Sequence, residues 1–185
     1  MELILVRHGE TVANKLKLIQ GQGDSALTEK GIRQAHSAAS RLRRRRMDAI
    51  YSSDLGRTRF IAEEIAKYHK LRVHYTKALR EKDMGELEGT PNSLKVPLIT
   101  MDTRRGESMH GFVSRIDGFL DRLYAAHGHG VVLLVTHKQV IRVISALLAD
   151  RPIIEERPPA YIKKITNASI HILDCSRPLI YTHEY

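Results

Sequence analysis

The chain has no tryptophan, one cysteine and no long apolar run, and each absence excludes a class of protein. Its one thiol, Cys175, cannot form a disulfide within the chain and lies in a strand-like run, so we expect a buried structural cysteine. No stretch reaches the roughly 18 consecutive apolar residues typical of a membrane span. The N-terminal apolar run has no basic leader or cleavage site. We therefore expect a cytoplasmic protein with no membrane partner.

Acidic residues are also few, and this imbalance favours anionic partners. Against 30 Lys and Arg there are 21 Asp and Glu, which gives a net charge of +9 that attracts anions over a long range. Part of the excess is an arginine cluster at residues 41–46, where an expected helix ends and cations complement its dipole. No aromatic residues alternate with these arginines to stack on bases, so we do not expect nucleic acid as a partner. A small phosphorylated substrate explains the charge equally well.

Composition otherwise predicts one ordinary domain. The 185 residues are 42% hydrophobic and 28% charged, which is typical of a single globular domain over residues 1–185. Eight of the ten histidines, all except His8 and His137, share no recurring metal-ligand spacing, so we expect no metal site.

Strands and helices alternate through the first three-quarters of the chain. Apolar runs predict strands at 3–6, 47–52, 72–75 and 130–137, the last of them buried on both faces. Helical spacing predicts helices between these strands, with these residues facing inward: Ile32, Ala35, Ala39 and Leu42; Ile61, Ala62, Ile65 and Tyr68; Phe112, Ile116, Phe119, Leu120 and Leu123. A further helix is expected over 139–148. The alternation predicts an α/β three-layer sandwich with a largely parallel central sheet flanked by helices.

Two segments have no regular pattern, and the C-terminal part departs from the alternation. Residues 12–25 are typical of a loop, and residues 79–107 are irregular, with a short cap or loop at about 82–106. A loop of this length is usually functional. Strands are expected at 161–165, 168–173 and 179–182, and an exposed one among them would allow a homodimer.

Ionisable side chains follow the ends of three of the expected strands. Arg7 and His8 follow the first strand, His137 follows the fourth, and Arg57 lies just beyond the second. Because carboxyl ends of parallel strands share one edge, where open α/β sheets bind ligands, these four side chains would meet there. Two imidazoles and two guanidiniums suit a dianion such as a phosphoryl group. Glu81, at the start of the irregular loop, is the best-placed proton donor.

The residues alone leave simpler roles open. Arg57 would also be placed to pair with Asp54, Glu81 would serve as a solvated loop carboxylate, and Asn14 would cap a turn. Glu107 either contacts the active-site arginines or begins a helix.

Short motifs occur along residues 3–142 in the order typical of one family. The chain holds Arg7-His8-Gly9-Glu10-Thr11 with Asn14, then Gln20-Gly21, Asp24, Leu27-Thr28-Glu29-Lys30-Gly31 with Gln34-Ala35, Tyr51-Ser52-Ser53-Asp54-Leu55 with Arg57, Leu79 and Glu81 with Gly85, Glu88 and Gly89, Gly106-Glu107-Ser108, and Thr136-His137. With these motifs the chain resembles the histidine phosphatase superfamily, which has the phosphoglycerate-mutase-like fold.

This resemblance implies a role for each site residue. His8 would be the nucleophile that forms a phosphohistidine, and Glu81 the general acid and base. Arg7, Arg57 and His137 would bind the oxygens of the transferred group and lower the pKa of His8. Neutral contacts would come from Asn14 and from Gln20 and Gly21. The resemblance implies no metal and no other cofactor, because the arginines supply the positive charge.

Departures from the family pattern affect specificity. Lys138 follows His137 where most relatives have glycine, Gln22 and Gly23 stand where an aromatic residue is common, and Met84 and Leu87 flank Gly85 where many relatives have an aromatic. We expect the candidate specificity residues to be Lys95, Arg104, Arg105 and Lys138.

The resemblance leaves phosphatase and mutase as alternatives. A mutase keeps water away from its phosphohistidine, which generally requires a lid, and the insert between Glu88 and Gly106 is short. We therefore expect a metal-independent histidine acid-type phosphatase, a phosphoric monoester hydrolase. The alternatives are a cofactor-dependent phosphoglycerate mutase and a catalytically silent anion-binding member of the fold.

Overall fold

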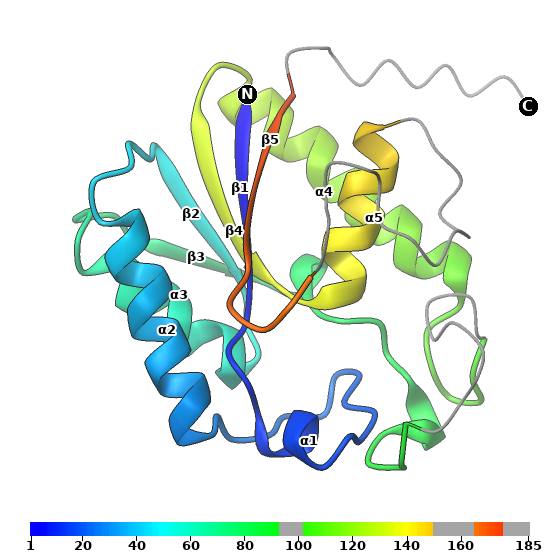
Figure 1. Cartoon of the computed structure of the whole chain (residues 1–185). Coiled ribbons are helices and arrows are strands. Elements are labelled where there is room, and N and C mark those ends of the chain that lie inside the picture. The colour runs from blue at the N-terminus through cyan, green and yellow to red at the C-terminus, as the bar shows by residue number, and fades with distance from the viewer. Residues whose placement is uncertain (93–101, 150–164, 176–185) are drawn as a thin grey trace, which may run out of the picture.

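The computed structural model describes residues 1–92, 102–149 and 165–175. Its centre is a five-stranded sheet of order β3-β2-β4-β1-β5 (Figure 1). The strands are β1 (Glu2–Arg7), β2 (Ala49–Ser53), β3 (Val73–Thr76), β4 (Val131–Thr136) and β5 (Ile170–Asp174). The helices are α1 (Val12–Lys15), α2 (Glu29–Leu42), α3 (Gly56–Ala66), α4 (Met109–His127) and α5 (Lys138–Leu148). The first four strands are parallel and β5 is antiparallel to β1, which confirms the expected α/β fold with a largely parallel sheet.

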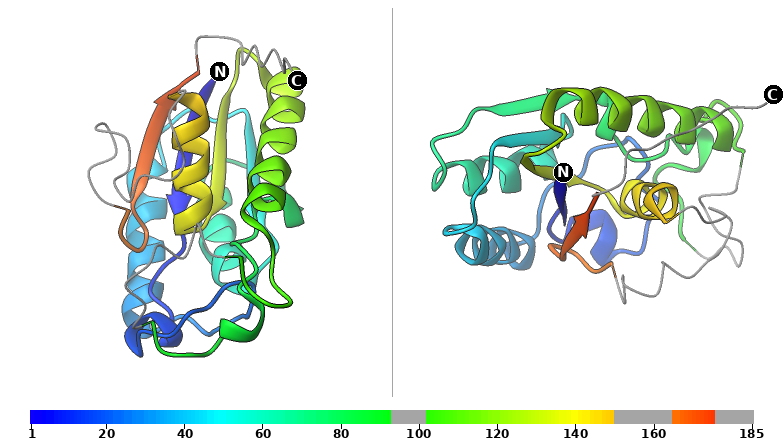
Figure 2. Two further views of the ribbon diagram at one scale, coloured as in Figure 1. Left: turned by 90° about the vertical axis from the view of Figure 1, so that its right-hand side faces the viewer. Right: turned by 90° about the horizontal axis from the view of Figure 1, so that it is seen from above.

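The sheet separates two hydrophobic layers because successive side chains of a strand point to opposite faces. Leu3 and Leu5 of β1 pack with α4 and α5, whereas Ile4 and Val6 pack with α2 and α3. Strand β4 alternates in the same way. Figure 2 shows α2 and α3 on one side of the sheet and α4 and α5 on the other. All four of these β1 side chains are fully buried, as expected for a strand covered on both faces.

The central position of β4 brings the expected site residues together. Strand β4 lies between β1 and β2, although it follows them in sequence by a long interval. Arg7 pairs in register with Thr136, so the residues that follow, His8 and His137, leave neighbouring strands at the same edge. This is the kind of switch in strand order at which open α/β sheets form ligand crevices.

Two residues expected to face inward do not. Ile32 on α2 is 37% exposed, and the buried stripe of that helix is instead made of small residues with Leu42 at its end: Gly31, Ala35, Ala38, Ala39 and Leu42. Tyr68 lies beyond the end of α3 and is 54% exposed, because the helix stops at Ala66 before its spacing brings Tyr68 inward. The expected inward residues of α4 are all buried.

The prediction of a loop over residues 12–25 was partly wrong, because this segment contains the one-turn helix α1. The Thr11 side chain accepts from Asn14 N and the Asn14 side chain accepts from Thr11 N, a reciprocal cap that stabilises so short a helix. The irregular segment contains two 3-10 turns, η1 (Lys77–Leu79) and η2 (Gly85–Leu87).

Three sequence predictions concern residues that are largely outside the described ones. The strand expected at 179–182 and all but the last residue of the one expected at 161–165 fall there, as does Lys95. The strand expected at 168–173 is β5, which begins two residues later and ends one residue later. Cys175 follows β5 and is buried as expected, and burial raises the pKa of its thiol to about 11.

Candidate active site

The two histidines that follow β1 and β4 lie side by side at the edge of the sheet, with their rings tilted by 55°. Their ring centroids are 5.3 Å apart, and both side chains are buried. Gly9, directly after His8, must be glycine because a Cβ there would lie 2.4 Å from the carbonyl oxygen of Gly31. The convergence expected from the strand ends is therefore present.

His8 is neutral, and its contacts determine which ring nitrogen has the proton. Burial lowers the pKa of His8 well below 6.5, and the charges of Arg57 and Arg7 lower it further. Its Nδ1 lies 2.7 Å from the carbonyl oxygen of Gly9, which can only accept. Nδ1 therefore donates, and Nε2 keeps a free lone pair.

His137 has the opposite arrangement. Its Nδ1 accepts from Nε of Arg57 at 3.3 Å, so in the neutral ring the proton is on Nε2, which donates to Oγ of Ser53 at 2.9 Å. Burial is also the largest cause that lowers the pKa of His137 well below its usual value. Both of its ring nitrogens contact protein groups. Sequence reasoning placed Ser53 in a family motif but gave it no role, although its place at the end of β2, beside β4, is a signal that was available.

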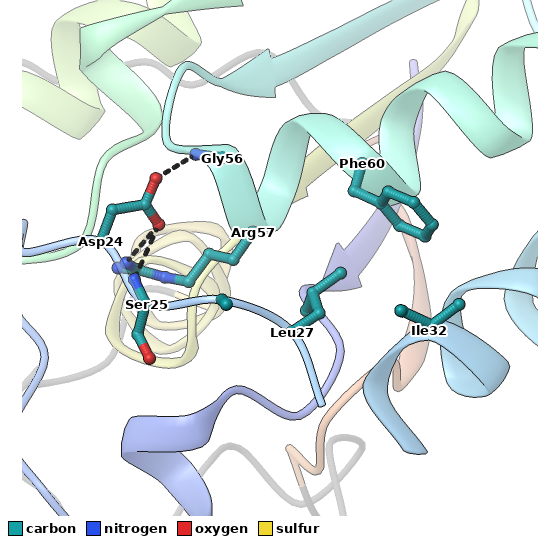
Figure 3. Close-up of a pocket in the computed structure, with 8 residues that line it drawn as sticks. Asp24, Ser25, Leu27, Ile32, Gly56, Arg57 and Phe60 are labelled. Carbon is teal, nitrogen blue, oxygen red and sulfur yellow. Dashed lines mark hydrogen bonds and ion pairs between the residues drawn. The ribbon is translucent and has the colours of Figure 1, made fainter. Parts of the chain in front are cut away.

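Arg57, in the first turn of α3, is held by a backbone loop. Its Nη2 donates to the carbonyl of Gly21 at 2.8 Å and its Nη1 to that of Gly23 at 2.6 Å. Asp24 lies 3.5 Å from Nη1 and also accepts from the N–H of Gly56 at 2.7 Å (Figure 3). The alternative pairing of Arg57 with Asp54 was wrong.

Asp54 pairs with Arg80 instead, through two contacts of 2.6 and 2.7 Å. Glu107 likewise pairs with Arg115 and contacts neither active-site arginine, which leaves its position just ahead of α4 as the better of its two expected roles.

Arg7 has an N–H with no protein partner. Its Nη1 donates to the carbonyl of Ile165 at 3.2 Å, but its buried Nε bonds to nothing among the described residues. Burial lowers the pKa of Arg7 to about 10, so it remains a cation at neutral pH. A buried N–H without a partner is costly unless a ligand accepts from it.

Glu81 is the carboxyl group that shares a pocket with Arg7, His8 and Arg57. Its oxygens accept from the backbone N–H groups of Lys82 at 3.1 Å and Gln139 at 3.3 Å. Burial raises the pKa of Glu81, and this effect exceeds the opposite influence of those N–H groups and of Arg57 and Arg7. A carboxyl group with a raised pKa is suited to donate a proton.

A pocket of about 150 Å³ joins these groups. It is lined by four of the five expected catalytic residues and by all four expected substrate-binding residues: Arg7, His8, Arg57 and Glu81, with Asn14, Gln20, Gly21 and Lys138. Oδ1 of Asn14 accepts from Asn167, and Oε1 of Gln20 accepts from Thr11, so the NH₂ group of each amide remains as the donor for a ligand. Burial lowers the pKa of Lys138, with Arg142 and Arg7 adding to the effect.

Two of the expected specificity residues lie elsewhere. Arg104 and Arg105 are exposed, lie 3.8 and 3.7 Å from Glu86, and do not line the pocket. Sequence reasoning did not single out Lys82 or Asn92, which do line it.

A larger hollow, of about 440 Å³, lies beside Arg57 without reaching His8 or Glu81. Figure 3 shows its apolar side, formed by Leu27, Ile32 and Phe60. Because neither His8 nor Glu81 lines this hollow, we do not assign the reaction to it.

The described residues contain no group of three or more His, Cys, Asp or Glu side chains arranged to hold a metal ion. Within the same part of the chain, no helix is long and apolar enough to cross a membrane.

Comparisons with known proteins identify one family and one fold. The model of the histidine phosphatase superfamily (branch 1) matches residues 3–179. A protein of Yersinia pestis named "Probable phosphoglycerate mutase GpmB" is 37% identical over 169 residues, which are 85% of this chain and 79% of that protein. Among solved structures, a mycobacterial glucosyl-3-phosphoglycerate phosphatase in complex with VO3 has a TM-score of 0.83 at 29% identity, covering 94% of this chain and 90% of that one. The alpha-ribazole phosphatase of Shigella flexneri has a TM-score of 0.73 at 28% identity, covering 83% of this chain and 82% of its own.

Proposed function

Because this chain belongs to the histidine phosphatase superfamily and is an enzyme that acts on phosphate esters, we propose that it hydrolyses a small phosphomonoester without a metal ion, through a phosphohistidine on His8. One observation supports this above all. The neutral ring of His8 has a free lone pair on Nε2, and it lines one pocket with the cationic side chains of Arg7 and Arg57 and with a carboxyl group of raised pKa. Each group in that set has a use in phosphoryl transfer.

Binding comes first in the proposed reaction. The phosphate dianion enters the 150 Å³ pocket and accepts from Nε of Arg7, from the guanidinium of Arg57 and from the amide groups of Asn14 and Gln20. These donors stand where charge spreads over the equatorial oxygens in the transition state, which is how phosphoryl transfer is accelerated.

Transfer to the enzyme follows. The Nε2 lone pair of His8 forms a bond to phosphorus while the ester P–O bond breaks. The departing alkoxide takes the proton of Glu81 and leaves as an alcohol. His8 retains its Nδ1 proton, bonded to the carbonyl of Gly9, and this contact favours the positively charged phosphoimidazole.

Hydrolysis regenerates the enzyme. The Glu81 carboxylate takes a proton from water, the water oxygen bonds to phosphorus, and the P–N bond breaks with its electron pair returning to Nε2 of His8. Inorganic phosphate leaves and Glu81 is protonated again. One carboxyl group thus serves both half-reactions.

His137 acts beside these steps. The sequence resemblance assigned it to the phosphoryl oxygens, but His137 does not line the pocket and both of its ring nitrogens are bonded to Arg57 and Ser53. Its role in this proposal is therefore to fix the plane of the Arg57 guanidinium. Its low pKa keeps this imidazole neutral, so it does not repel Arg57.

A phosphoglycerate mutase remains the second candidate, favoured by the name of the Yersinia relative. In that reaction the phosphoryl group of His8 returns to a substrate hydroxyl and not to water. The third candidate, a silent anion-binding member, would keep the pocket without turnover.

The test is phosphate release from a panel of phosphomonoesters in EDTA, with interconversion of 2- and 3-phosphoglycerate assayed in parallel. We expect hydrolysis that EDTA does not affect and that the His8→Ala variant loses. Interconversion without net phosphate release would favour the mutase. Ligand binding that His8→Ala retains, with no turnover in either protein, would favour the silent module.

A further inference from the structure

Glu88 lies directly after η2, and its carboxylate accepts hydrogen bonds from three backbone N–H groups. Oε1 accepts from the N–H of Gln22 at 2.7 Å and from that of Met84 at 3.1 Å, and Oε2 accepts from the N–H of Gly23 at 2.7 Å. The carboxylate therefore connects two segments that are far apart in sequence, the loop of residues 20–23 and the turn that follows Glu81. Charge-assisted bonds of this kind are stronger than those between neutral groups.

The loop that Glu88 holds is the same loop that holds Arg57. The peptide group between Gly21 and Gln22 donates its N–H to Glu88 and accepts from Arg57 through its carbonyl, 2.8 Å from Nη2. A trans peptide is planar, so fixing its N–H also fixes the direction of its C=O. The same arrangement recurs two residues after Gly21 in this loop. The N–H of Gly23 donates to Glu88, and the carbonyl of Gly23 accepts from Arg57.

Glycine at position 21 makes this close approach feasible. Gly21 has a φ of +50°, and a Cβ there would lie 1.9 Å from Oε1 of Glu88. The carboxylate thus occupies the space that a side chain at position 21 would need, and it lies directly against the loop. This fit is specific to the loop and would not be expected of a solvated surface carboxylate.

From these contacts we propose that Glu88 is a positioning residue for Arg57, acting through the loop of residues 20–23. The proposal rests on the phosphatase function proposed above, in which Arg57 stabilises the transition state. Without the Glu88 carboxylate the two carbonyls lose their fixed direction, and the guanidinium loses its alignment with His137 and the pocket. Transition-state binding is more sensitive to such a misalignment than ground-state binding, because near-ångström displacements decide it.

The test compares Glu88→Gln and Glu88→Ala with Glu86→Gln as the matched control. Glu86 is an exposed carboxylate two residues earlier, inside η2, and it lies near Arg104 and Arg105. For Glu88→Ala we expect kcat to fall between about 10- and 100-fold with little change in KM. Inhibition by orthovanadate, which mimics the transition state, should weaken by a similar factor, whereas binding of inorganic phosphate should change little. Glu88→Gln should lie between Glu88→Ala and the wild type, because its amide oxygen still accepts.

A second readout does not depend on turnover. In the wild type the Nε–H resonance of Arg57 should be shifted and protected from exchange by its bond to His137, and both properties should be lost in Glu88→Ala and reduced in Glu88→Gln. If the wild type releases no phosphate but these resonances change as stated, the positioning stands and the proposed function fails. If Glu88→Ala does not fold, Glu88→Gln provides both readouts.

Two results would overturn the positioning role. In the first, the variants fold and their kcat, their inhibition by vanadate and their Arg57 resonance are all unchanged. The other is an equal loss of vanadate and phosphate binding that merely follows the loss of folded protein, which is what a purely structural role would give.

Discussion

The two active-site histidines differ in which nitrogen has the proton. His8 donates from Nδ1 to the carbonyl of Gly9, whereas His137 accepts at Nδ1 from Arg57 and donates from Nε2 to Ser53. Of the two, therefore, only His8 has a ring nitrogen with no partner among the described residues. This difference supports His8 as the nucleophile without reference to relatives.

The first prediction at this scale concerns Glu81. Replacing Glu81 by Gln removes the proton donor, so kcat for alkyl phosphates should fall about 10²- to 10⁴-fold. Aryl esters with acidic leaving groups, such as 4-nitrophenyl phosphate, need little protonation and should lose much less. The measurement is kcat for both ester classes, with the exposed Glu86→Gln as control. Equal losses for the two classes would contradict the general-acid role.

The pH dependence of kcat/KM tests the same assignment, because the assigned protonation states predict the direction of the change. The active form needs neutral His8 and protonated Glu81. Because burial lowers the pKa of His8 and raises that of Glu81, kcat/KM for alkyl esters should decline on the alkaline side as Glu81 ionises. That alkaline decline should disappear in Glu81→Gln.

A second prediction at the residue scale concerns Lys138. It lines the pocket beside Arg7 and Glu81 as the first residue of α5, where a cation opposes the helix dipole. This cost suggests a gain from anionic substrates. Replacing Lys138 by Gln should raise KM several-fold and reduce the dependence of kcat/KM on salt. The distant, exposed Arg44→Gln should do neither, and an unchanged KM in Lys138→Gln would exclude it from substrate binding.

At the scale of elements, periodicity predicted the strands because burial on both faces leaves a continuous apolar run, as in β4. Periodicity was less successful where the packing between elements decides which residues of a helix are buried. Ile32 has helical spacing with Ala35 and Ala39, but α2 lies against the sheet and α3 through its small residues, and Ile32 is left beside the hollow of Figure 3. Helix spacing alone does not specify where such a stripe is centred.

The site shows the same division. The sequence predicted which strands lead to His8, His137 and Arg57, because each strand is an apolar run and these residues follow the runs. The roles of Ser53, Glu88 and Asn167 could not, because each depends on a side chain reaching a segment distant in sequence. Lys95 lies outside the described residues, and its role stays a prediction.

The prediction at the element scale concerns the cap of α1. Thr11 is buried, its Oγ1 accepts from Asn14 N at 3.2 Å, and it donates to Oε1 of Gln20 at 2.9 Å. Thr11→Val keeps the shape and removes both bonds, so it should cost about 1 kcal/mol of stability. Since Asn14 and Gln20 both line the pocket, KM should rise more than kcat falls.

The matched control is Thr28→Val, which removes the cap of α2 away from the pocket. It should cost similar stability and leave KM unchanged. A parallel change of KM in both variants would mean that the α1 cap has no specific link to the site.

For the whole molecule, the buried imidazoles link stability to pH. The pKa values of His8 and His137 lie well below 6.5 in the folded protein, so only the unfolded chain takes up these two protons as the pH falls below that value. Stability should therefore be full above about pH 6.5 and should decline below it, by up to about 1.4 kcal/mol per imidazole for each pH unit.

Glu81 acts in the opposite direction. Its folded pKa is raised above 4.5, so the folded protein takes up this proton first and gains stability as the pH falls towards that value. On acidification two imidazoles lower the stability of the folded protein and only one carboxyl group raises it, so stability should fall overall. The fall should be steeper in Glu81→Gln. Urea unfolding at pH values on both sides of 6.5 measures it, and stability that rises on acidification would contradict the assigned protonation states.

The central claim for the molecule as an enzyme is that His8 takes up the phosphoryl group. The most direct measurement is rapid quenching of turnover in EDTA with alkali, which spares the P–N bond, followed by mass spectrometry of the peptide that contains His8. We predict one phosphoryl group on His8, more of it when Glu81→Gln acts on an aryl ester, and none in His8→Ala. Phosphate release that continues in His8→Ala, or that proceeds with no phosphorylated His8 at any time point, would contradict the proposed mechanism.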